Sequence, residues 1–254
     1  MYSVGIDVGS VAAKAVIFDG KNIIAKKITP TGWSPKESGQ QLFEEIIEVN
    51  DIKRQEIKSI VGTGYGRISL PFLDQKVTEI TCHGKGAYFL DASIRTVIDI
   101  GGQDSKVISL DSKGNVIDFL MNDKCAAGTG KFLQVMAHAL EIEVGELSTI
   151  AQGVEAQTIS SMCTVFAESE IISLMAEGAS KESIAAGLLQ SVCSKAYTLA
   201  SKVGVKEKVF FSGGVSKNPL LKDLLSKKLH TEVISSEFSQ YLGAIGAAVI
   251  GYKK

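Results

Sequence analysis

The sequence contains a short pattern that occurs twice, 92 residues apart. Residues 6–16 (IDVGSVAAKAV) align with residues 98–108 (IDIGGQDSKVI), and aspartate, glycine and lysine recur at matching places. Each copy is typical of a strand, a glycine turn and a second strand. Chance similarity between two hairpins is the alternative explanation. The repeat predicts a chain of two related halves, each of which opens with a hairpin.

Apolar spacing along the rest of the chain alternates between the helical and the extended period. Helices are expected over residues 40–49, 83–90, 129–140, 164–176, 184–203 and 240–251, and strands over 57–61, 116–121, 208–211 and 231–234. Strands that alternate with helices favour an α/β fold. We expect one half over residues 1–92 and the other over 93–239, with a C-terminal helix at 240–254 that packs back on the first.

Composition narrows the class of protein. The 254 residues are 45% hydrophobic and 22% charged, which is ordinary globular usage, and the net charge is −1. That charge argues against nucleic acid or an anionic membrane as a partner held by bulk charge. The start of the chain lacks a basic, signal-like segment, and the apolar run at 242–250 is too short to span a bilayer. The expectation is a cytoplasmic protein with reduced thiols.

Three glycine turns follow expected strands, at Gly9-Ser10, Gly101-Gly102 and Gly213-Gly214. Such turns let backbone N–H groups approach phosphate closely. None matches the GxxxxGK[ST] or GxGxxG pattern. Asp7 and Asp99 precede the first two turns, and two aspartates that face each other across a cleft would hold Mg²⁺ largely through water. The alternative is that Asp7 only caps a turn.

These turns resemble those of the actin-like ATPase superfamily, which includes sugar kinases and Hsp70-type chaperones. Residues 5–10 (GIDVGS) and 98–102 (IDIGG) resemble its two phosphate loops, residues 211–214 (FSGG) its adenosine loop, and residues 240–249 its second connecting helix. The resemblance implies two ribonuclease-H-like halves around a cleft that binds ATP or ADP with Mg²⁺.

Site residues follow from that resemblance. Asp7 and Asp99 would position Mg²⁺, and Gln103 or Asp104 would orient the attacking water, unless both simply hold the turn. The nucleotide would contact Gly9, Ser10, Val11, Ala12, Ala13, Lys14, Gly101, Gly102, Gln103, Gly128, Gly130, Gly213, Gly214, Asn218, Gln240 and Gly243.

Two of the four cysteines, Cys125 and Cys163, are each expected directly before a helix. A helix N-terminus lowers a thiol pKa and stabilises anionic ligands, and a thiolate-bound iron–sulfur cluster is such an anion. Two thiolates do not complete a four-cysteine site, but two subunits of a dimer would. Buried, unreactive cysteines are the alternative. Cys82, His83 and Cys193 are expected to serve packing.

Local sequences resemble the ATP-dependent activators of 2-hydroxyacyl-CoA dehydratases, relatives of the ATPase subunits of benzoyl-CoA reductase. The matching motifs are residues 64–67 (GYGR), 122–130 (NDKCAAGTG), 163–170 (CTVFAESE) and 243–248 (GAIGAA). The resemblance implies a homodimer in which Cys125 and Cys163 of each subunit hold one [4Fe–4S] cluster. It also implies an ATPase that passes one low-potential electron to an iron–sulfur dehydratase or a double-cubane reductase, with ferredoxin or flavodoxin as the donor.

The first loop departs from that family at Val11 and Ala13, where hydroxyl residues are usual, so it lacks hydroxyls that could contact phosphate or Mg²⁺. In the expected mechanism, the halves close and open between the ATP and ADP states, and the helices after the cysteines relay that change. Two other functions compete with an activator: a small-molecule kinase of the same fold, and a regulatory ATPase without a cluster. A kinase has no use for Cys125 and Cys163 at helix starts, whereas the regulatory ATPase stays open.

Overall fold

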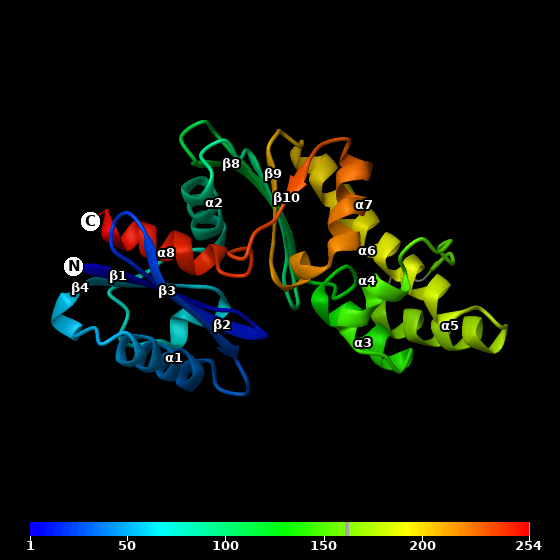
Figure 1. Ribbon diagram of the computed structural model, residues 1–254, viewed down its shortest axis with the longest axis horizontal. Helices are drawn as coiled ribbons and strands as arrows, with labels where there is room; N and C mark the ends of the chain where they lie inside the picture. Colours follow the sequence, from blue (N-terminus) through cyan, green and yellow to red (C-terminus); the bar gives the residue numbers. More distant parts are fainter. Residues whose placement is uncertain (161–162, 254) are drawn as a thin grey trace. The chain divides into compact units, whose positions relative to one another are not determined.

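The computed structural model describes residues 1–160 and 163–253, which divide into two compact units (Figure 1). Unit 1 contains residues 1–97, 108–119 and 236–254, and unit 2 contains residues 98–107 and 120–235. The units therefore do not follow a single boundary near residue 92, because residues 108–119 group with unit 1. Residues 161 and 162, which belong to the motif before Cys163, and residue 254 of the expected last helix lie outside the described residues.

The first sheet has the strand order β3-β2-β1-β4-β5. Its strands are β1 (Tyr2–Val8), β2 (Ala12–Phe18), β3 (Ile23–Pro30), β4 (Ile57–Thr63) and β5 (Gln75–Lys76). β1 runs antiparallel to β2, with Asp7 opposite Lys14, and parallel to β4, with Asp7 opposite Thr63. The hairpin predicted from the repeat is thus confirmed, but the sequence did not lead us to expect β3 as its third strand.

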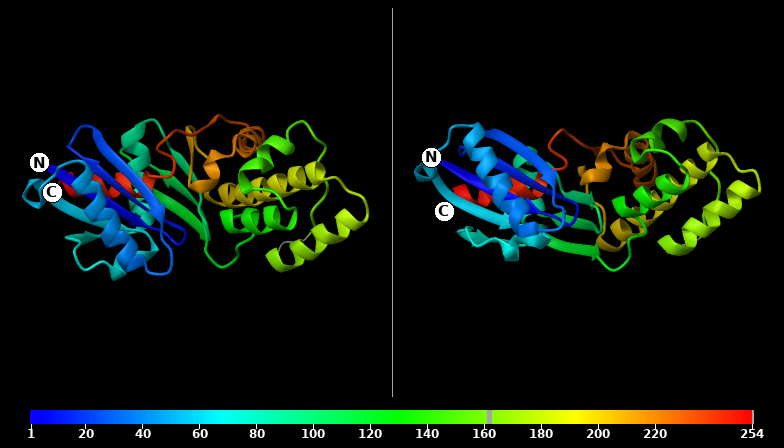
Figure 2. Two further views of the ribbon diagram at one scale, coloured as in Figure 1. Left: turned by 60° about the horizontal axis from the view of Figure 1, so that its bottom comes forward. Right: turned by 90° about the horizontal axis from the view of Figure 1, so that it is seen from below.

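Helices cover both faces of the first sheet (Figure 2). On one face, α1 (Pro35–Val49) packs Leu42 and Ile46 against alternate residues of β1, including Ile6. On the other face lie α2 (Glu79–Leu90) and α8 (Leu242–Tyr252), and α8 contacts β1, β4 and α2. Because side chains alternate along a strand, Asp7 belongs to the face that α8 covers. This alternation brings Asp7 to the start of α8.

The second sheet repeats the strand order of the first, as β8-β7-β6-β9-β10. Its strands are β6 (Thr96–Ile100), β7 (Ser105–Leu110), β8 (Val116–Asn122), β9 (Val209–Ser212) and β10 (Val233–Ile234). In each sheet the first strand is central, its hairpin partner follows on one side, and the fourth and fifth strands follow on the other. The repeat at residues 6–16 and 98–108 therefore marks the same strands of two like sheets.

Unit 2 contains most of the remaining helices. They are α3 (Gly130–Ala139), α4 (Leu147–Ile150), α5 (Thr164–Ala176), α6 (Lys181–Val203) and α7 (Pro219–Leu229). Short 3₁₀ turns are η1 (Arg54–Glu56), η2 (Tyr65–Ser69), η3 (Val144–Glu146) and η4 (Gly214–Lys217). Phe132, Leu189 and Phe211 belong to one large core that joins α3, α6 and β9.

The expected helices and strands are all present, with shifted ends, and one expectation about the cysteines is wrong. Cys163 is the N-cap of α5, as predicted, but Cys125 lies five residues before α3 begins at Gly130. The helix-dipole argument therefore applies to Cys163 and not directly to Cys125. Across the described residues, none of the helices combines the length and apolar composition that a membrane span requires.

Candidate functional site

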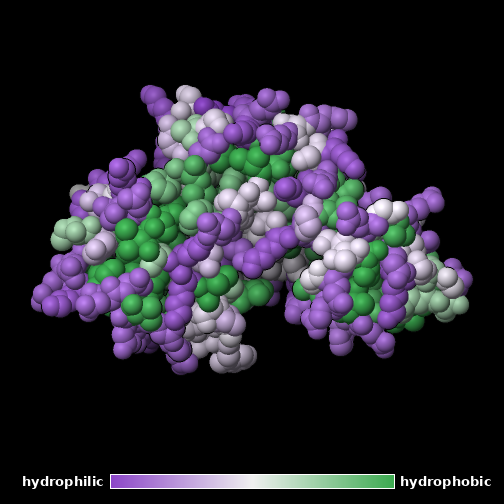
Figure 3. All heavy atoms as spheres, viewed as in Figure 1, coloured by the Kyte–Doolittle hydropathy of each residue, from purple (hydrophilic) through white to green (hydrophobic). Residues whose placement is uncertain are grey.

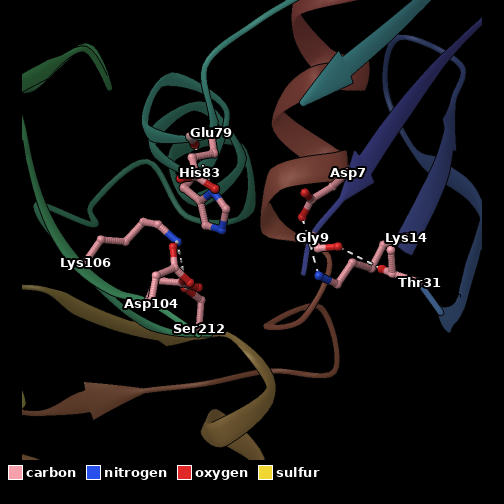
Figure 4. A network of polar contacts seen from close by, with 10 residues as sticks. Asp7, Gly9, Lys14, Thr31, Glu79, His83, Asp104, Lys106 and Ser212 are labelled. Atoms are coloured by element: carbon pink, nitrogen blue, oxygen red, sulfur yellow. Dashed lines mark hydrogen bonds and ion pairs between the residues drawn. The ribbon is translucent and has the colours of Figure 1, made fainter. Parts of the chain in front are cut away.

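The first glycine turn, between β1 and β2, forms a loop with an exposed tip. The N–H of Gly9 donates to the carbonyl of Ala12 at 3.1 Å, and the hydroxyl of Thr31 donates to the carbonyl of Gly9 at 2.8 Å (Figure 4). Ser10 and Val11 are exposed at the tip. Thr31 is buried directly after β3, and its hydrogen bond to Gly9 fixes the turn. The loop therefore has a defined shape without a ligand, and its exposed backbone could contact one.

Asp7 lies in β1, two residues before Gly9; it is buried and forms a loose ion pair. Its Oδ2 lies 3.6 Å from the Nζ of Lys14, which is longer than the 2.7–2.9 Å of a tight charge-assisted hydrogen bond. Gly243 and His83 adjoin the same carboxylate: a Cβ atom on Gly243 would lie 2.8 Å from Asp7 Oδ2 and 3.1 Å from His83 Cε1. Within unit 1, therefore, the structure brings together the first loop, Asp7, Lys14, Gly243 and the unexpected His83.

The second turn, between β6 and β7, is tied down more tightly. Asp99 Oδ2 accepts from Lys106 Nζ at 2.9 Å, and Asp99 Oδ1 accepts from Ser212 Oγ at 2.6 Å. Lys106 also pairs with Asp104 Oδ2 at 2.7 Å, and both Asp99 and Lys106 are buried. Asp104 thus helps to hold the turn, which was the alternative to a role in orienting water. Gln103 is exposed.

Backbone hydrogen bonds connect this second turn to the start of α3. Gly130 N donates to the carbonyl of Gly101 at 2.9 Å, and Lys131 N donates to that of Gly102 at 2.8 Å. These two N–H groups belong to the first turn of a helix, where donors lack partners within the helix. The second loop and the segment after Cys125 therefore form one hydrogen-bonded unit.

The expected adenosine loop adjoins the same strand end. Gly213 adopts a φ of +87°, and a Cβ atom there would collide with the carbonyl of Ile100. Asn218 is the N-cap of α7, where its side chain accepts from Leu221 N at 2.9 Å. Gly128 also has a positive φ, of +88°. Unit 2 thus brings together Gly101, Gly102, Gly130 and Gly213, while Gln240 precedes α8 in unit 1.

The four cysteines fall into two classes. Cys82 and Cys193 are buried, and burial raises the pKa of Cys82 to about 12 and that of Cys193 to about 11. Cys125 and Cys163 are exposed. The first two match the predicted packing role, because a thiol with so high a pKa is neither a nucleophile nor a ready metal ligand at neutral pH. Only the exposed pair is suited to bind a metal.

Both exposed cysteines lie near enough to Lys195 of α6 to interact with its charge. Burial lowers the pKa of Lys195, and the negative charges of the nearby Cys125 and Cys163 thiolates oppose that shift. The lysine stem passes Gly128, where a Cβ atom would lie 3.0 Å from Lys195 Cδ. The Asn122 side chain fixes the backbone of Cys125, since its Nδ2 donates to the Cys125 carbonyl at 2.9 Å. Both thiols therefore interact electrostatically with the same lysine.

Apolar side chains are exposed along α5, the helix that begins after Cys163. Val165 and Phe166 are 68% and 70% exposed, and Ile172 on the same helix is 55% exposed. Figure 3 shows hydrophobic side chains at the surface of the part that contains α5. The opposite side of α5 packs inward through Ala167 and Ile171. A helix that is apolar on both sides is typical of one that contacts another protein.

Sequence reasoning missed several residues that the structure adds to these sites, namely Thr31, His83, Lys106, Lys195 and Ser212. Lys106 was detectable, because it matches Lys14 in the repeat. Ser212 lies within the expected adenosine loop, and His83 was expected to serve packing, so neither was assigned to a site. Thr31 and Lys195 come from distant segments, and we find no local signal for them. Arg67 donates to the carbonyl of Gly64 at 2.8 Å and so holds its own turn.

Comparisons with known proteins give a consistent match along the chain. The model of the BadF/BadG/BcrA/BcrD ATPase family matches residues 4–251. The activator of lactoyl-CoA dehydratase from Anaerotignum propionicum is 45% identical, over 100% of this chain and 98% of its own. Component A of (R)-2-hydroxyglutaryl-CoA dehydratase from Acidaminococcus fermentans has a TM-score of 0.95 at 43% identity, with coverage of 100% and 98%. The 2-hydroxyisocaproyl-CoA dehydratase activator from Clostridium difficile, with bound ADPNP, has a TM-score of 0.92 at 41% identity, with coverage of 100% and 95%.

More distant structures bear on the fold alone. A ROK family glucokinase from Streptomyces griseus has a TM-score of 0.57 at 13% identity, over 100% of both chains. The predicted α/β, actin-like ATPase fold is thereby confirmed. At that identity, the glucokinase carries no argument about activity.

Proposed function

Because the chain belongs to the BadF/BadG/BcrA/BcrD ATPase family, we propose that it is an ATP-dependent activator of an iron–sulfur enzyme such as a 2-hydroxyacyl-CoA dehydratase. It would couple ATP hydrolysis to the delivery of single low-potential electrons. The observation that carries this proposal is the exposed pair Cys125 and Cys163 around Lys195, in a chain whose other cysteines are buried. A small-molecule kinase needs no such pair and is not favoured.

For the nucleotide, we assign the phosphates to the loops at Gly9 and Gly101 and the adenosine to the turn at Gly213. The ATPase family and the ADPNP-bound relative support ATP or ADP as the ligand. Asp7 is the stronger candidate to position Mg²⁺, because both oxygens of Asp99 already accept hydrogen bonds from Lys106 and Ser212. Magnesium, when bound through water, would neutralise charge on the phosphates. Asp7 would orient that hydrated ion.

For the cluster, the donor set fits only if two chains contribute. Within residues 1–160 and 163–253, no group of three or more potential ligands is present that could hold a metal ion. Cys125 and Cys163 would supply two of the four thiolates that a [4Fe–4S] cluster takes, and a second copy the other two. The exposed Val165 and Phe166 beside Cys163 supply apolar surface for that contact. When bound, the cluster supplies the one-electron chemistry.

The hydrogen bonds between the second loop and α3 support a coupling route. Contacts to the γ-phosphate exist in the ATP state and are lost on hydrolysis, so the loop at Gly101 and Gly102 experiences different contacts in the two states. Gly130 and Lys131 are bonded to that loop, and Cys125 lies five residues earlier. A differential interaction of a few kcal/mol would shift a two-state equilibrium substantially. We infer that nucleotide state acts on the cysteine segment through these two bonds.

Electron donor and acceptor follow from the family resemblance. We propose a ferredoxin or flavodoxin as the donor and an iron–sulfur dehydratase or double-cubane reductase as the acceptor. The named activators of lactoyl-CoA and 2-hydroxyisocaproyl-CoA dehydratases support the dehydratase as the first candidate. The homodimer and the cytoplasmic location belong to the same proposal.

Anaerobic purification tests the proposal directly. We expect brown protein with about four irons per two chains, a dimeric mass, and ATPase activity. Cys125→Ala and Cys163→Ala should each lose the iron and the colour. Cys193→Ala, at a buried cysteine, is the matched control and should keep both. Colourless wild-type protein that phosphorylates a sugar or an acid would overturn the proposal in favour of a kinase.

A further inference from the structure

Thr63 carries a buried hydroxyl that is not hydrogen-bonded. The residue ends β4 and is fully buried, and in the described part of the chain its Oγ1 has no hydrogen-bond partner. The thiol of Cys82 lies beside it: burial raises the pKa of that thiol, and the Thr63 hydroxyl opposes the rise. A thiol is a weak hydrogen-bonding group, and the two side chains do not meet at hydrogen-bonding geometry. Because most buried hydroxyls are hydrogen-bonded, this one indicates a partner in another state of the molecule.

Asp7 is the neighbour of Thr63 on the adjacent strand. The two residues are opposite each other in the parallel pairing of β1 with β4, so their side chains leave the sheet on the same face. A Cβ atom on Gly64 would lie 2.3 Å from Asp7 Oδ1, which places that oxygen beside the residue that follows Thr63. The other oxygen, Oδ2, faces Lys14 at 3.6 Å. Asp7 therefore turns one oxygen toward the end of β4 and the other toward β2.

Unit 2 contains the corresponding hydrogen bond. Ser212 ends β9 as Thr63 ends β4, and each residue precedes a glycine of positive φ. The hydroxyl of Ser212 donates to Asp99 Oδ1 at 2.6 Å, and Asp99 is the counterpart of Asp7 in the repeat. On this scaffold, a hydroxyl at the end of the fourth strand thus reaches the aspartate of the first. Rotation about a single side-chain bond redirects such a hydroxyl between staggered positions.

We propose that Thr63 is a positioning residue for Asp7: in the nucleotide-bound state, its hydroxyl turns from Cys82 and donates a hydrogen bond to Asp7 Oδ1. This inference rests on the proposed nucleotide site. Phosphate competes with Asp7 for the ammonium group of Lys14, and Thr63 then supplies the donor that keeps the carboxylate in place. A hydroxyl bonds more strongly to a carboxylate than to a thiol, and bonds of this kind orient the groups that hold a hydrated metal ion.

Two substitutions separate the hydroxyl of Thr63 from its methyl group. Thr63→Val keeps the shape and removes the hydroxyl, whereas Thr63→Ser keeps the hydroxyl and removes the methyl. We expect Thr63→Val to lower kcat/KM for Mg²⁺·ATP about tenfold, through the loss of one hydrogen bond to a charged group, and Thr63→Ser to stay within about twofold of wild type.

Stability without nucleotide should follow the opposite order. Thr63→Val should be at least as stable as wild type in urea, because it removes a buried hydroxyl that lacks a partner. Thr63→Ser should be less stable, because it leaves a small cavity where the methyl group was. A role in packing alone predicts that activity and stability fall together, so the crossed order distinguishes the two roles.

Metal dependence gives an independent readout. Mg²⁺·ADPNP should protect Thr63→Val against thermal unfolding less than it protects wild type, whereas metal-free ADP should protect both alike, since Asp7 acts on the ion. A general packing defect would weaken both kinds of protection. If Thr63→Val does not fold, Thr63→Ala replaces it, because it differs from Thr63→Ser only by the hydroxyl oxygen.

Hydrolysis by Thr63→Val at the wild-type rate would overturn the inference, as would activities that follow the order of stability. Equal protection of Thr63→Val and wild type by Mg²⁺·ADPNP would overturn it as well, and the same outcomes apply to Thr63→Ala where it stands in. If wild type itself neither binds ADPNP nor hydrolyses ATP, the proposed function fails, and that result is distinct from these.

Discussion

The two glycine loops share one scaffold and differ in how their aspartates are held. Asp7 and Lys14 recur 92 residues later as Asp99 and Lys106, and each pair forms an ion pair. In the first loop, Lys14 Nζ lies 3.6 Å from Asp7 Oδ2, and the lysine side chain is 18% exposed. In the second loop, Lys106 Nζ lies 2.9 Å from Asp99 Oδ2, and the lysine side chain is 3% exposed. The two copies of the pattern share these partners and differ in the tightness of the contact.

The glycines that close the two strand ends repeat as well. Gly64 and Gly213 have φ values of +78° and +87°, a conformation that other residues adopt only with strain. A Cβ atom on Gly64 would lie 2.6 Å from the carbonyl oxygen of Val8, and one on Gly213 would lie 2.6 Å from the carbonyl carbon of Ile100. The backbone is the same in both places, so the difference lies in side chains. We infer that the second loop is braced and connected to α3, while the first holds its carboxylate by a looser ion pair.

The cysteines extend this comparison and give the largest expected effect. Unit 1 has one thiol, Cys82, whose pKa burial raises from 9.0 to about 12. At pH 8 its thiolate fraction is then roughly a thousandfold below that of an ordinary thiol, and it recovers only as the pH approaches 12. Brief alkylation of cluster-free protein, mapped by mass spectrometry, should label Cys125 and Cys163 and spare Cys82 and Cys193. Denatured protein is the control, in which all four should react. Rapid labelling of native Cys82 would contradict the assignment.

Asp99→Asn should reduce stability more than any other single change in either loop. Lys106 is buried, and Asp99→Asn removes the charge of one carboxylate that pairs with it while the lysine charge stays buried. We expect a loss of about 3–5 kcal/mol in the free energy of unfolding, measured in urea. Asp104→Asn is the matched control, and because that side chain is 24% exposed, its loss should be smaller. Equal stability of Asp99→Asn and wild type would refute the view that the second loop is braced by this pair.

Asp7→Asn should have the converse effect, on activity rather than stability. Its ion pair with Lys14 is loose, at 3.6 Å, and the lysine reaches solvent more than Lys106 does, so the free energy of unfolding should fall by less than in Asp99→Asn, by about 1 kcal/mol. If Asp7 orients hydrated Mg²⁺, kcat for ATP hydrolysis should fall about 100-fold, measured as phosphate release. Unchanged hydrolysis would favour the alternative that Asp7 only caps the turn.

Local patterns predicted the scaffold, and long-range contacts determined the difference between its halves. The repeat at residues 6–16 and 98–108 predicted both hairpins and their aspartates, and the resemblance of the glycine turns implied the actin-like fold. It could not reveal that Ser212, 113 residues from Asp99, would close the second site. Nor could it show that Lys195 would interact electrostatically with both Cys125 and Cys163. His83 is buried as expected, but only the tertiary structure places Gly243 between it and Asp7. The nucleotide, magnesium and cluster roles of the site residues remain predictions.

Gly130→Ala tests the link between the second loop and the cysteine segment, where the smallest effect is expected. A Cβ atom there would lie 3.1 Å from the carbonyl oxygen of Gly101, so the loop must shift by a few tenths of an ångström or the hydrogen bond must lengthen. Alanine favours the helix by about 1 kcal/mol relative to glycine. This gain offsets the cost of the tight contact, so the free energy of unfolding should hardly change. The response of Cys125 alkylation to Mg²⁺·ADPNP should shrink about threefold, within the range of couplings carried by single contacts.

Gly145→Ala is the control for that substitution, because no atom lies within 4 Å of the place of its Cβ. It should leave the nucleotide response of Cys125 at the wild-type level. If Gly130→Ala also leaves that response unchanged, while the variant still binds Mg²⁺·ADPNP, the two hydrogen bonds to Gly101 and Gly102 are not the route. The bracing of the second loop would then serve stability alone, and the division of roles between the loops would have to be explained by contacts elsewhere in unit 2.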